Sequence, residues 1–400
     1  MPSPLPARSS PNPPGVLVAA LSGRALAAAA RRAGYRPLVA DLFQDQDTRR
    51  LAARSARVAG GLAEGLSEVS LIAAMSRLAG QETTPPAGFV YGAGFEHRPE
   101  LLARIGARWP LLGNPPEVVA RIKDPVSFST LLATLSIPHP EITLAPPANP
   151  RGWLAKRSAA SGGGHIRPAG RDGALYDGVY FQRRVRGRPV SALFLANGRD
   201  ATMIGFSEQW ASSGGPRSPF RFGGAVQPAG LTPQLAATLG NVVRRLAAAT
   251  RLVGLNSADF MVRDGAFDLL EVNPRPGATL DIFDLDPEAP LFALHCAACR
   301  GGLPKARQRT RRAAACAVVY APRKITVPAM VKWPHWAADR PDPNSLIGRG
   351  EPLCTVLARG AKPSAARQEV AERAQRILTT VERRRPRHRP RILREAEAPC

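Results

Sequence analysis

Short apolar runs alternate with helix-like segments in the N-terminal part of the chain. Residues 15–20 form an apolar run that suits a buried parallel strand, and residues 37–41 repeat this pattern with an acid at the end. A Gly-containing turn and an Ala-rich helix that ends near Gly34 lie between the two runs. Residues 88–92 form a further run. Strands that alternate with helices predict a doubly wound, Rossmann-like parallel sheet.

The pattern changes near residue 111, and from about residue 151 to 285 strand-like runs alternate with Gly-rich loops. Two of these runs, residues 258–262 and 267–272, flank the dipeptide Asp264-Gly265. Asp-Gly between two strand-like runs is a strong signal for a tight hairpin turn. The sequence therefore predicts an antiparallel hairpin in this region.

The predicted hairpin brings candidate metal ligands together. It places Asp259 beside Glu271, and Asn273 faces the same side as Glu271 because it follows by two residues. Arg275 comes next, between two prolines. Converging carboxylates repel each other unless a cation neutralises them, and carboxylate and amide oxygens suit Mg²⁺, which commonly bridges nucleotide phosphates. The alternative, a hairpin with ordinary surface acids, does not explain why Asn273 and Arg275 follow Glu271 so closely.

The 400-residue chain is strongly basic, with 55 Lys and Arg, 31 Asp and Glu, and a formal net charge of +24. This charge suggests nucleic acid as a partner. Only six of the basic residues are Lys, however, and an aromatic content of 6% is low for stacking on bases. Nucleic acid is therefore disfavoured, and the many Arg residues favour an anionic small molecule instead.

Several other classes of protein are disfavoured. No stretch approaches the ~20 apolar residues of a membrane span. The five Cys are scattered, which argues against a disulfide framework, and Cys296 and Cys299 lack the second ligand pair of a zinc site. Residues 291–299 are therefore predicted to form a core helix. Ser22-Gly23-Arg24 interrupts the apolar residues near the N-terminus, which argues against a signal peptide and predicts a cytoplasmic protein.

The order of these motifs resembles that of the ATP-grasp superfamily. Asp259, Glu271, Asn273 and Arg275 resemble its metal-binding signature, and two of the six lysines fall where the superfamily has its nucleotide-binding lysines. The resemblance implies that nucleotide is bound by Lys123, Lys156, the glycine loop Ser161, Gly162, Gly163 and Gly164, and the adenine hinge Gln182, Arg183 and Val185. It also implies that Asp259, Glu271 and Asn273 hold Mg²⁺, with Mn²⁺ as an alternative ion, and that Asn273 and Arg275 are catalytic.

The resemblance implies a multidomain fold of mixed α/β and α+β class. Residues 15–117 are expected to form a Rossmann-like pre-ATP-grasp domain, residues 118–302 an ATP-grasp domain with antiparallel sheets, and residues 313–380 a small β-rich C-terminal cap. Residues 1–14 and 383–400 are predicted to be disordered. This build is most similar to the carboligase branch that is related to biotin carboxylase.

The function that the resemblance implies is that of an ATP-dependent carboxylate–amine ligase, which forms a C–N bond through an acyl phosphate and releases ADP and phosphate. In biotin carboxylase a glutamate that works on bicarbonate follows the arginine by four residues, whereas this chain has Thr279 there. This departure disfavours bicarbonate as the substrate. The expected partners are a small-molecule carboxylate and an amine, with a homodimer as an open alternative to a monomer.

Three further points of function stay open. Residues 112–116 and 259–279 resemble in sequence the ligases of one-carbon cofactor synthesis. This resemblance suggests a role in tetrahydromethanopterin or methylofuran biosynthesis. The first alternative function is an ATP-binding protein without ligase activity. The second is an Arg-rich, RNA-linked protein.

Overall fold

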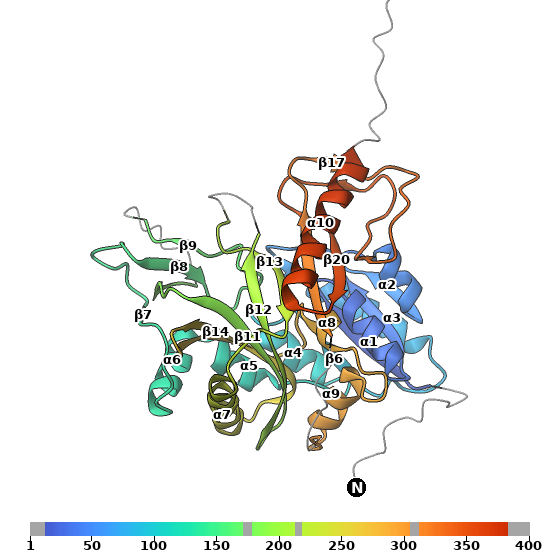
Figure 1. Cartoon of the computed structure of the whole chain (residues 1–400). Helices are drawn as coiled ribbons and strands as arrows, with labels where there is room; N and C mark the ends of the chain where they lie inside the picture. Colours follow the sequence, from blue (N-terminus) through green and yellow to red (C-terminus); the bar gives the residue numbers. More distant parts are fainter. Residues whose placement is uncertain (1–12, 171–177, 213–217, 305–311, 383–400) are drawn as a thin grey trace, which may run out of the picture.

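The computed structural model describes residues 13–170, 178–212, 218–304 and 312–382. Most of the two predicted disordered ends, residues 1–12 and 383–400, therefore lies outside the described residues. The chain has the predicted mixed α/β and α+β class. In Figure 1 a parallel sheet (blue) lies on the right, a small antiparallel sheet lies on the left, and a large antiparallel sheet runs between them.

The N-terminal sheet is parallel, as the alternation of strands and helices predicts. Its strand order is β3-β2-β1-β6. The bounds are β1 (Gly15–Ala20), β2 (Arg36–Asp41), β3 (Arg54–Arg57) and β6 (Phe89–Tyr91). Val16 and Val18 on β1 pack with the Ala-rich helix α1 (Arg24–Arg32), whereas Leu17 and Ala19 pack with α3 (Glu68–Gly80) and α4 (Pro99–Gly106). Both faces of the sheet are thus covered, which explains the unbroken apolar run.

The remaining N-terminal elements are short. Asp45 begins helix α2 (Gln46–Leu51) by accepting a hydrogen bond from the Thr48 backbone N–H over 2.7 Å. A small hairpin consists of β4 (Gly60–Gly61) and β5 (Gly65–Leu66). These elements follow the carboxyl ends of β2 and β3, the edge of an open parallel sheet where ligands usually bind.

The large sheet has eight antiparallel strands in the order β15-β14-β11-β12-β13-β16-β20-β18. Helix α7 (Pro233–Thr250) covers part of it, with Leu239 and Val243 packed against Phe194 and Phe260. The strand bounds are β11 (Arg188–Asn197), β12 (Ala201–Ala211), β13 (Phe222–Gln227), β14 (Val253–Arg263), β15 (Ala266–Asn273), β16 (Ala313–Tyr320), β18 (Ala337–Ala338) and β20 (Pro352–Gly360).

The predicted hairpin is present as β14 and β15. Asp264 and Gly265 form its turn, with φ of 50° and 79°. A two-residue turn with positive φ at both positions is the type that matches the twist of the flanking strands, and Asp-Gly suits it. A bulge follows Asp259, where the pairing shifts between Asp259 and Phe260.

The small sheet has the strand order β7-β10-β8-β9. Its bounds are β7 (Ile142–Thr143), β8 (Trp153–Arg157), β9 (Arg167–Pro168) and β10 (Val179–Arg183). Two helices precede it, α5 (Pro116–Lys123) and α6 (Pro125–Thr134). Asp124 begins α6 as its N-cap, where its side chain accepts a hydrogen bond from the Ser127 backbone N–H over 2.7 Å. Lys123 is thereby fixed at the junction of α5 and α6.

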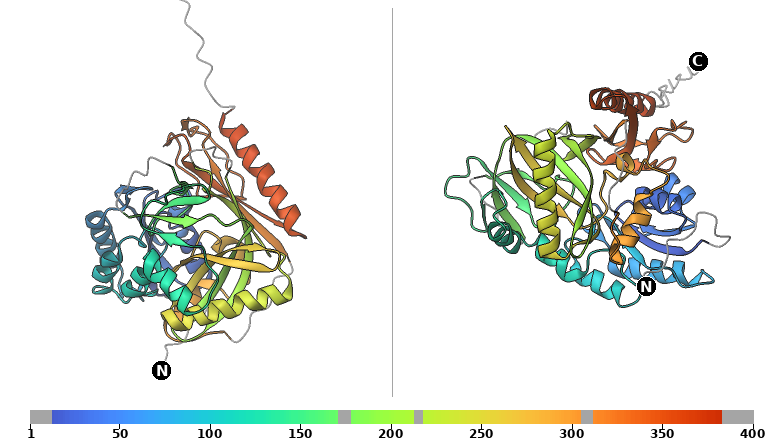
Figure 2. Two further views of the ribbon diagram at one scale, coloured as in Figure 1. Left: turned by 90° about the vertical axis from the view of Figure 1, so that its left-hand side faces the viewer. Right: turned by 60° about the horizontal axis from the view of Figure 1, so that its bottom comes forward.

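The C-terminal strands extend the large sheet instead of forming a separate one. β16 pairs with β13, and β20 and β18 follow it. Helix α10 (Pro363–Glu382, red in Figure 2) lies along these strands. Its residues Ala366, Val370 and Ile377 belong to the same hydrophobic cluster as the strands. A two-stranded sheet of β17 (Ile325–Thr326) and β19 (Leu346–Ile347) completes this part.

Residues 291–299 form the predicted core helix, α9 (Leu291–Cys299), after the short helix α8 (Leu280–Phe283). His295 is buried; its Nδ1 accepts the Leu255 N–H over 2.8 Å, and its Nε2 lies 3.0 Å from the Leu112 carbonyl oxygen. Burial lowers the pKa of His295 to about 4, so the ring is neutral. The helix therefore connects distant segments. None of the described helices combines the length and the apolar character that a membrane span requires.

Candidate active site

The β14–β15 hairpin brings the three predicted metal ligands together. Asp259 lies directly opposite Glu271, and Asn273 lies opposite Ser257. Asn273 donates through Nδ2 to Oδ2 of Asp259 over 3.1 Å, and Gln209 donates through Nε2 to Oδ1 of Asp259 over 3.4 Å. The second of these contacts holds Asp259 from β12, which lies two strands away in the sheet.

The pKa values of the two facing carboxylates are shifted in opposite directions. Burial and the nearby Glu271 raise the pKa of Asp259 to about 6. The pKa of Glu271 is lowered, because Lys123, Lys156 and His165 outweigh the effect of its burial. Like charges that face each other in this way favour a bound cation. Two carboxylates and an amide oxygen are hard donors of the kind that Mg²⁺ prefers, so the residues fit the ion that the resemblance implies.

No other such site is evident. In the part of the chain that the structure describes, no group of three or more His, Cys, Asp or Glu is placed to hold a metal ion. The set at the hairpin includes only two carboxylates, and its third member is an amide. The buried Cys296 lies on the core helix α9 and is a free thiol.

Lys123 lies against the hairpin. Its buried ammonium donates to Oδ1 of Asn273 over 3.1 Å and lies 3.8 Å from Oε2 of Glu271. The hydroxyl of Ser158 donates to the Lys123 carbonyl over 2.9 Å, which ties α5 to the small sheet. Lys123 thus supplies a fixed positive charge beside the predicted metal ligands.

Lys156 and Gln182 meet on adjacent strands of the small sheet. Lys156 on β8 is buried and donates to Oε1 of Gln182 on β10 over 3.1 Å. Its ammonium also lies 5.8 Å from the centre of the Tyr180 ring. The structure therefore brings together the second predicted lysine and the first hinge residue.

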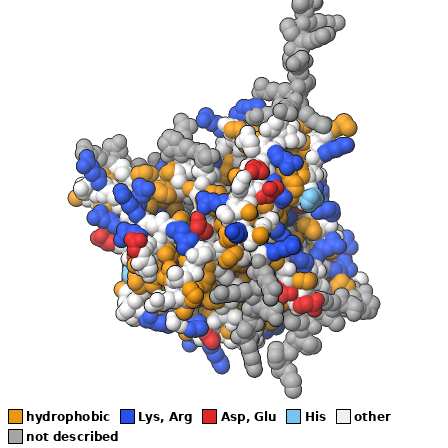
Figure 3. Space-filling view, in the orientation of Figure 1, with side chains coloured by type: hydrophobic (Ala, Val, Ile, Leu, Met, Phe, Trp, Pro, Cys, Tyr) orange, Lys and Arg blue, Asp and Glu red, His pale blue; other side chains and the backbone are white. Residues whose placement is uncertain are grey.

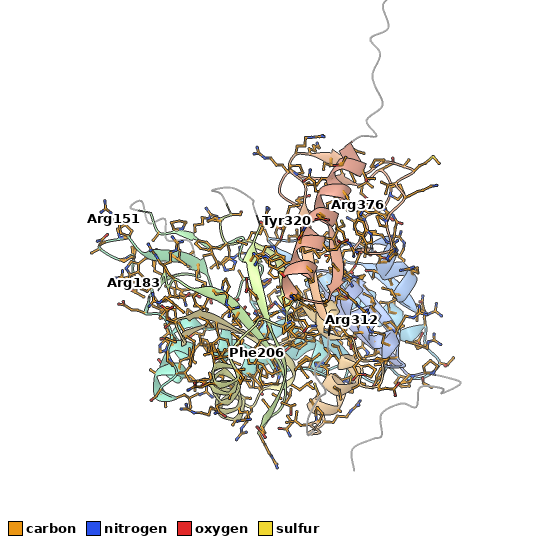
Figure 4. The ribbon with its side chains drawn as sticks, in the orientation of Figure 1. Arg151, Arg183, Phe206, Arg312, Tyr320 and Arg376 are labelled. Atoms are coloured by element: carbon orange, nitrogen blue, oxygen red, sulfur yellow. The ribbon has the colours of Figure 1, made fainter. Side chains whose placement is uncertain are left out.

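The other two hinge residues lie differently. Arg183 is exposed, and its guanidinium lies 5.2 Å from the centre of the Trp153 ring. Figure 4 shows Arg183 with Arg151 at the outer end of the small sheet. Adjacent strand residues face opposite sides, so the side chain of Arg183 faces away from that of Gln182. Val185 is half-buried in the connection to β11. The nucleotide contacts of both residues stay predictions.

The glycine loop needs its glycines. Gly162 and Gly163 have φ of 75° and 71°, and a Cβ on Gly163 would lie 2.1 Å from the Phe220 carbonyl oxygen. The Gly162 carbonyl accepts the Phe222 N–H over 2.9 Å, and this hydrogen bond connects the loop to the start of β13. Ser161 and Gly164 flank these two residues. The roles of all four in phosphate binding stay predictions.

His165 follows the glycine loop in the sequence. Its Nδ1 is buried without a hydrogen-bond partner among the described residues. Burial lowers the pKa of His165 to about 4, although the negative charge of Glu271 acts in the opposite direction. The ring is therefore neutral at pH 7, and it interacts electrostatically with Glu271.

Arg275 is held by a residue that sequence reasoning missed. Its Nε donates to Oε1 of Glu96 over 2.5 Å, and both side chains are buried. Glu96 also accepts the backbone N–H of Gly94 over 2.8 Å and of Phe95 over 3.1 Å. Although burial alone would raise it, the pKa of Glu96 falls to about 2 because of Arg275 and Lys123. Its place after the carboxyl end of β6 was the one available signal.

A second contact fixes the chain next to Arg275. The Pro274 carbonyl accepts a hydrogen bond from Nδ2 of Asn114 over 2.9 Å and lies 3.2 Å from the hydroxyl of Tyr91. Both of these side chains are buried. The N-terminal sheet thus holds the exit of the hairpin at two points, Pro274 and Arg275.

A cavity of about 680 Å³ adjoins Arg275. Its walls come from the N-terminal sheet, from residues 275–281 after the hairpin, and from the C-terminal strands, where Tyr320 is labelled in Figure 4. The volume lies within the ~300–1,000 Å³ range of small-molecule sites. Arg275 therefore lies both beside the metal-site hairpin and in the wall of a cavity that can hold a substrate.

Comparisons with known proteins agree with this arrangement. The family model of the ATP-grasp domain matches residues 123–279. Among solved structures, pyruvate carboxylase from Rhizobium etli matches with a TM-score of 0.69 and 17% identity over 91% of this chain and 37% of that chain. The biotin carboxylase domain of the Hydrogenobacter thermophilus 2-oxoglutarate carboxylase, in complex with MgADP, ADP and bicarbonate, has a TM-score of 0.69 and 12% identity over 90% and 88%.

A third structure is an amino acid ligase. The L-amino acid ligase from Bacillus licheniformis matches with a TM-score of 0.67 and 13% identity over 91% of this chain and 97% of that chain. No curated protein sequence matches the chain. At these identities the structural likeness shows the fold, and this chain spans only 37% of the pyruvate carboxylase. The matched region, residues 123–279, contains Lys123, Lys156, the glycine loop and the hairpin, so this part of the chain matches an ATP-grasp domain. The chain as a whole shares its fold with the biotin carboxylase domain and with the L-amino acid ligase.

Proposed function

We propose that the chain is an ATP-dependent ligase that joins a carboxylate to an amine through an acyl phosphate. One observation carries this proposal: Arg275 lies between the Asp259–Glu271 hairpin and a substrate-sized cavity. The ATP-grasp domain match supports nucleotide binding. The likeness to an L-amino acid ligase supports the formation of a bond between a carboxylate and an amine.

The proposed nucleotide site runs from the small sheet to the hairpin. Adenine would lie near Gln182, Arg183 and Val185, with the phosphates near Lys156, Lys123 and the glycine loop. Mg²⁺ held by Asp259, Glu271 and Asn273 would neutralise the phosphate charge. This direction places the γ-phosphate nearest the hairpin and Arg275, because the hinge is at the other end of the site.

The proposed reaction has two steps. A carboxylate oxygen attacks the γ-phosphorus, the bond to the bridging oxygen breaks, and ADP leaves. A neutral amine then attacks the acyl carbon of the acyl phosphate, the carbon–oxygen bond to phosphate breaks, and the proton that the amine loses leaves with the phosphate. Arg275 would stabilise the oxyanion of the second step, and Asn273 would hold Asp259 in place.

Thr279 supports an organic carboxylate over bicarbonate. It is buried at the start of α8, where the carboxylase pattern has a glutamate. A role in the biosynthesis of a one-carbon cofactor of the tetrahydromethanopterin or methylofuran type is part of the proposal and rests on the wording of the motifs. A cytoplasmic location, a homodimer, and the division into functional domains at residues 15–117, 118–302 and 313–380 are further parts of the proposal.

The two alternatives make different demands on the structure. An ATP-binding protein without ligase activity would not need the complete set of Asp259, Glu271, Asn273 and Arg275. An RNA-linked protein would gain from a concentrated basic surface, whereas Figure 3 shows Lys and Arg side chains spread over the visible face. The ligase accounts for more of the observations than either alternative.

An ADP-release screen with paired carboxylates and amines tests the proposal. We expect release only when a carboxylate, an amine, ATP and Mg²⁺ are all present. The double variant Asp259→Ala, Glu271→Ala serves as the control for contaminating ATPases. Tight binding of MgATP with no stimulation by any pair across a broad screen would favour the ATP-binding protein instead.

A further inference from the structure

The cavity beside Arg275 is largely apolar but carries buried charges. Its apolar lining includes Leu21, Leu42, Phe43, Leu280, Val318 and Leu353. Such a wall suits a substrate with an apolar body, because the buried apolar surface stabilises the complex. The charges on the wall then decide which polar group this body carries.

A buried arginine on the wall is shared between two carboxylates. Arg24, at the start of α1, bonds both oxygens of Asp281 over 2.7 Å. It also bonds Asp339, over 2.9 Å and 3.1 Å. These residues join the N-terminal sheet, the segment after the hairpin and the C-terminal part. Because one positive charge faces two negative charges, this cluster has an excess of negative charge.

Asp45 adds a carboxylate that forms no ion pair with another described residue. Its side chain is buried, with 4% of the residue exposed, and it lines the cavity. Oδ1 accepts the Thr48 N–H over 2.7 Å, and none of the ion pairs between described residues includes Asp45. The cation that acts on it is Arg49, whose guanidinium is paired with Asp342. Burial, together with the charges of Asp339 and Asp41, raises the pKa of Asp45 to about 7. The ionised form of Asp45 is therefore destabilised by its burial and by the neighbouring negative charges.

The remaining charged groups on the wall do not balance this excess. Arg275 is neutralised by Glu96. Asp342 pairs with Arg49 and is more than two-fifths exposed. Arg57 and Glu351 are exposed, so water screens them. The unbalanced charge that is also buried is thus the negative charge around Asp45 and Asp339.

We infer that this cavity binds the amine substrate as an ammonium ion with an apolar body, and that the ammonium pairs with Asp45 beside Asp339. One proton of the ammonium then passes to the Asp45 carboxylate, and the neutral amine attacks the acyl phosphate. The assignment to the amine rests on the proposed ligase function, whereas the preference for a cation rests on the cavity alone. The inference concerns the amine alone and gives it a charge opposite to that of the anionic partner that the Arg-rich composition favours. The basic residues set the net charge of the chain, but the buried wall of the cavity has the opposite sign.

The test compares three small probes of one shape. n-Hexylamine, n-hexanol and hexanoate are titrated calorimetrically into the full chain at about pH 8, where the amine is protonated and Asp45 is mostly ionised. We expect hexylamine to bind about tenfold more tightly than either of the others, as one charge-assisted hydrogen bond allows. Asp45→Asn, which keeps an N-cap oxygen for Thr48, should remove this advantage and leave hexanol binding unchanged.

Asp342→Asn is the matched control, because Asp342 also lines the cavity but already has a cation. It should bind hexylamine as tightly as the parent does. Tighter binding of hexanoate than of hexylamine to the parent chain would overturn the inference, and so would an unchanged hexylamine affinity in folded Asp45→Asn. The comparison of probes on the parent decides the matter even if the variant fails to fold. Since no turnover is needed, hexylamine binding to a chain that releases no ADP would refute the ligase and keep the cation site.

Discussion

Arg275 and Glu96 form a buried ion pair of 2.5 Å that joins the end of the β14–β15 hairpin to the loop after β6. The two residues are far apart in the sequence. Arg275 is the predicted stabiliser of the acyl-transfer oxyanion, so Glu96 acts as a positioning residue for it. The N-terminal part of the chain would in this way contribute to the proposed chemistry through Glu96.

Glu96→Gln should impair turnover more than nucleotide binding. The variant leaves Arg275 charged and unpaired in the interior, so its guanidinium is free to shift. We expect kcat for ADP release to fall by about tenfold or more with KM for ATP unchanged, and the free energy of unfolding to fall by about 3 kcal/mol. Glu100→Gln is the control, since Glu100 is exposed and pairs with Arg98 at 3.3 Å. Equal kcat values for the two variants would contradict the positioning role.

The pair Asp259→Ala, Glu271→Ala should abolish the binding of MgATP and leave the fold intact. These carboxylates face each other and strain the free protein, so their loss removes repulsion as well as metal ligands. Binding of a fluorescent ATP analogue with and without Mg²⁺ measures the effect. Asp268→Ala, on the same strand β15, should bind as the parent does. Turnover by the double variant at the parental rate would show that the metal site is elsewhere.

Lys156→Ala should weaken nucleotide binding by at least about tenfold. Lys156 is buried beside Gln182, whereas Lys362 is exposed and precedes α10. Lys362→Ala therefore serves as the control for the loss of a general positive charge. If the two variants bind MgATP equally well, Lys156 does not contact the phosphates.

Asp45→Asn should change how stability depends on pH. The pKa of Asp45 is raised to about 7 in the folded chain, so the folded state favours the protonated form. This contribution to stability is present at low pH and is lost as the pH rises toward 7. Asparagine does not titrate, so the variant has no such loss. Its free energy of unfolding, relative to that of the parent, should therefore increase between about pH 4 and pH 8. Urea denaturation at both pH values measures this, and parallel changes in the two proteins would refute a buried, strained Asp45.

Local signals predicted more of the site than did any feature that depends on distant segments. Asp264-Gly265 favours a tight turn because both residues adopt positive φ. This turn sets the register that places Asp259 opposite Glu271. Asn273 follows from the two-residue period of a strand. Glu96 and the Arg24–Asp281–Asp339 cluster depend on the packing of remote elements, which no local pattern encodes. For the same reason the pairing of β16 with β13 was not foreseen.

The central claim is that the γ-phosphate of ATP is transferred to a carboxylate. The most direct test supplies the carboxylate with isotopically labelled oxygen, together with an amine, and follows the label into the products by mass spectrometry. Transfer of the γ-phosphate to a carboxylate predicts ADP in a one-to-one ratio with amide, one labelled oxygen in each released phosphate, and no gain from bicarbonate with biotin. AMP as the stoichiometric product, or phosphate without label, would contradict it.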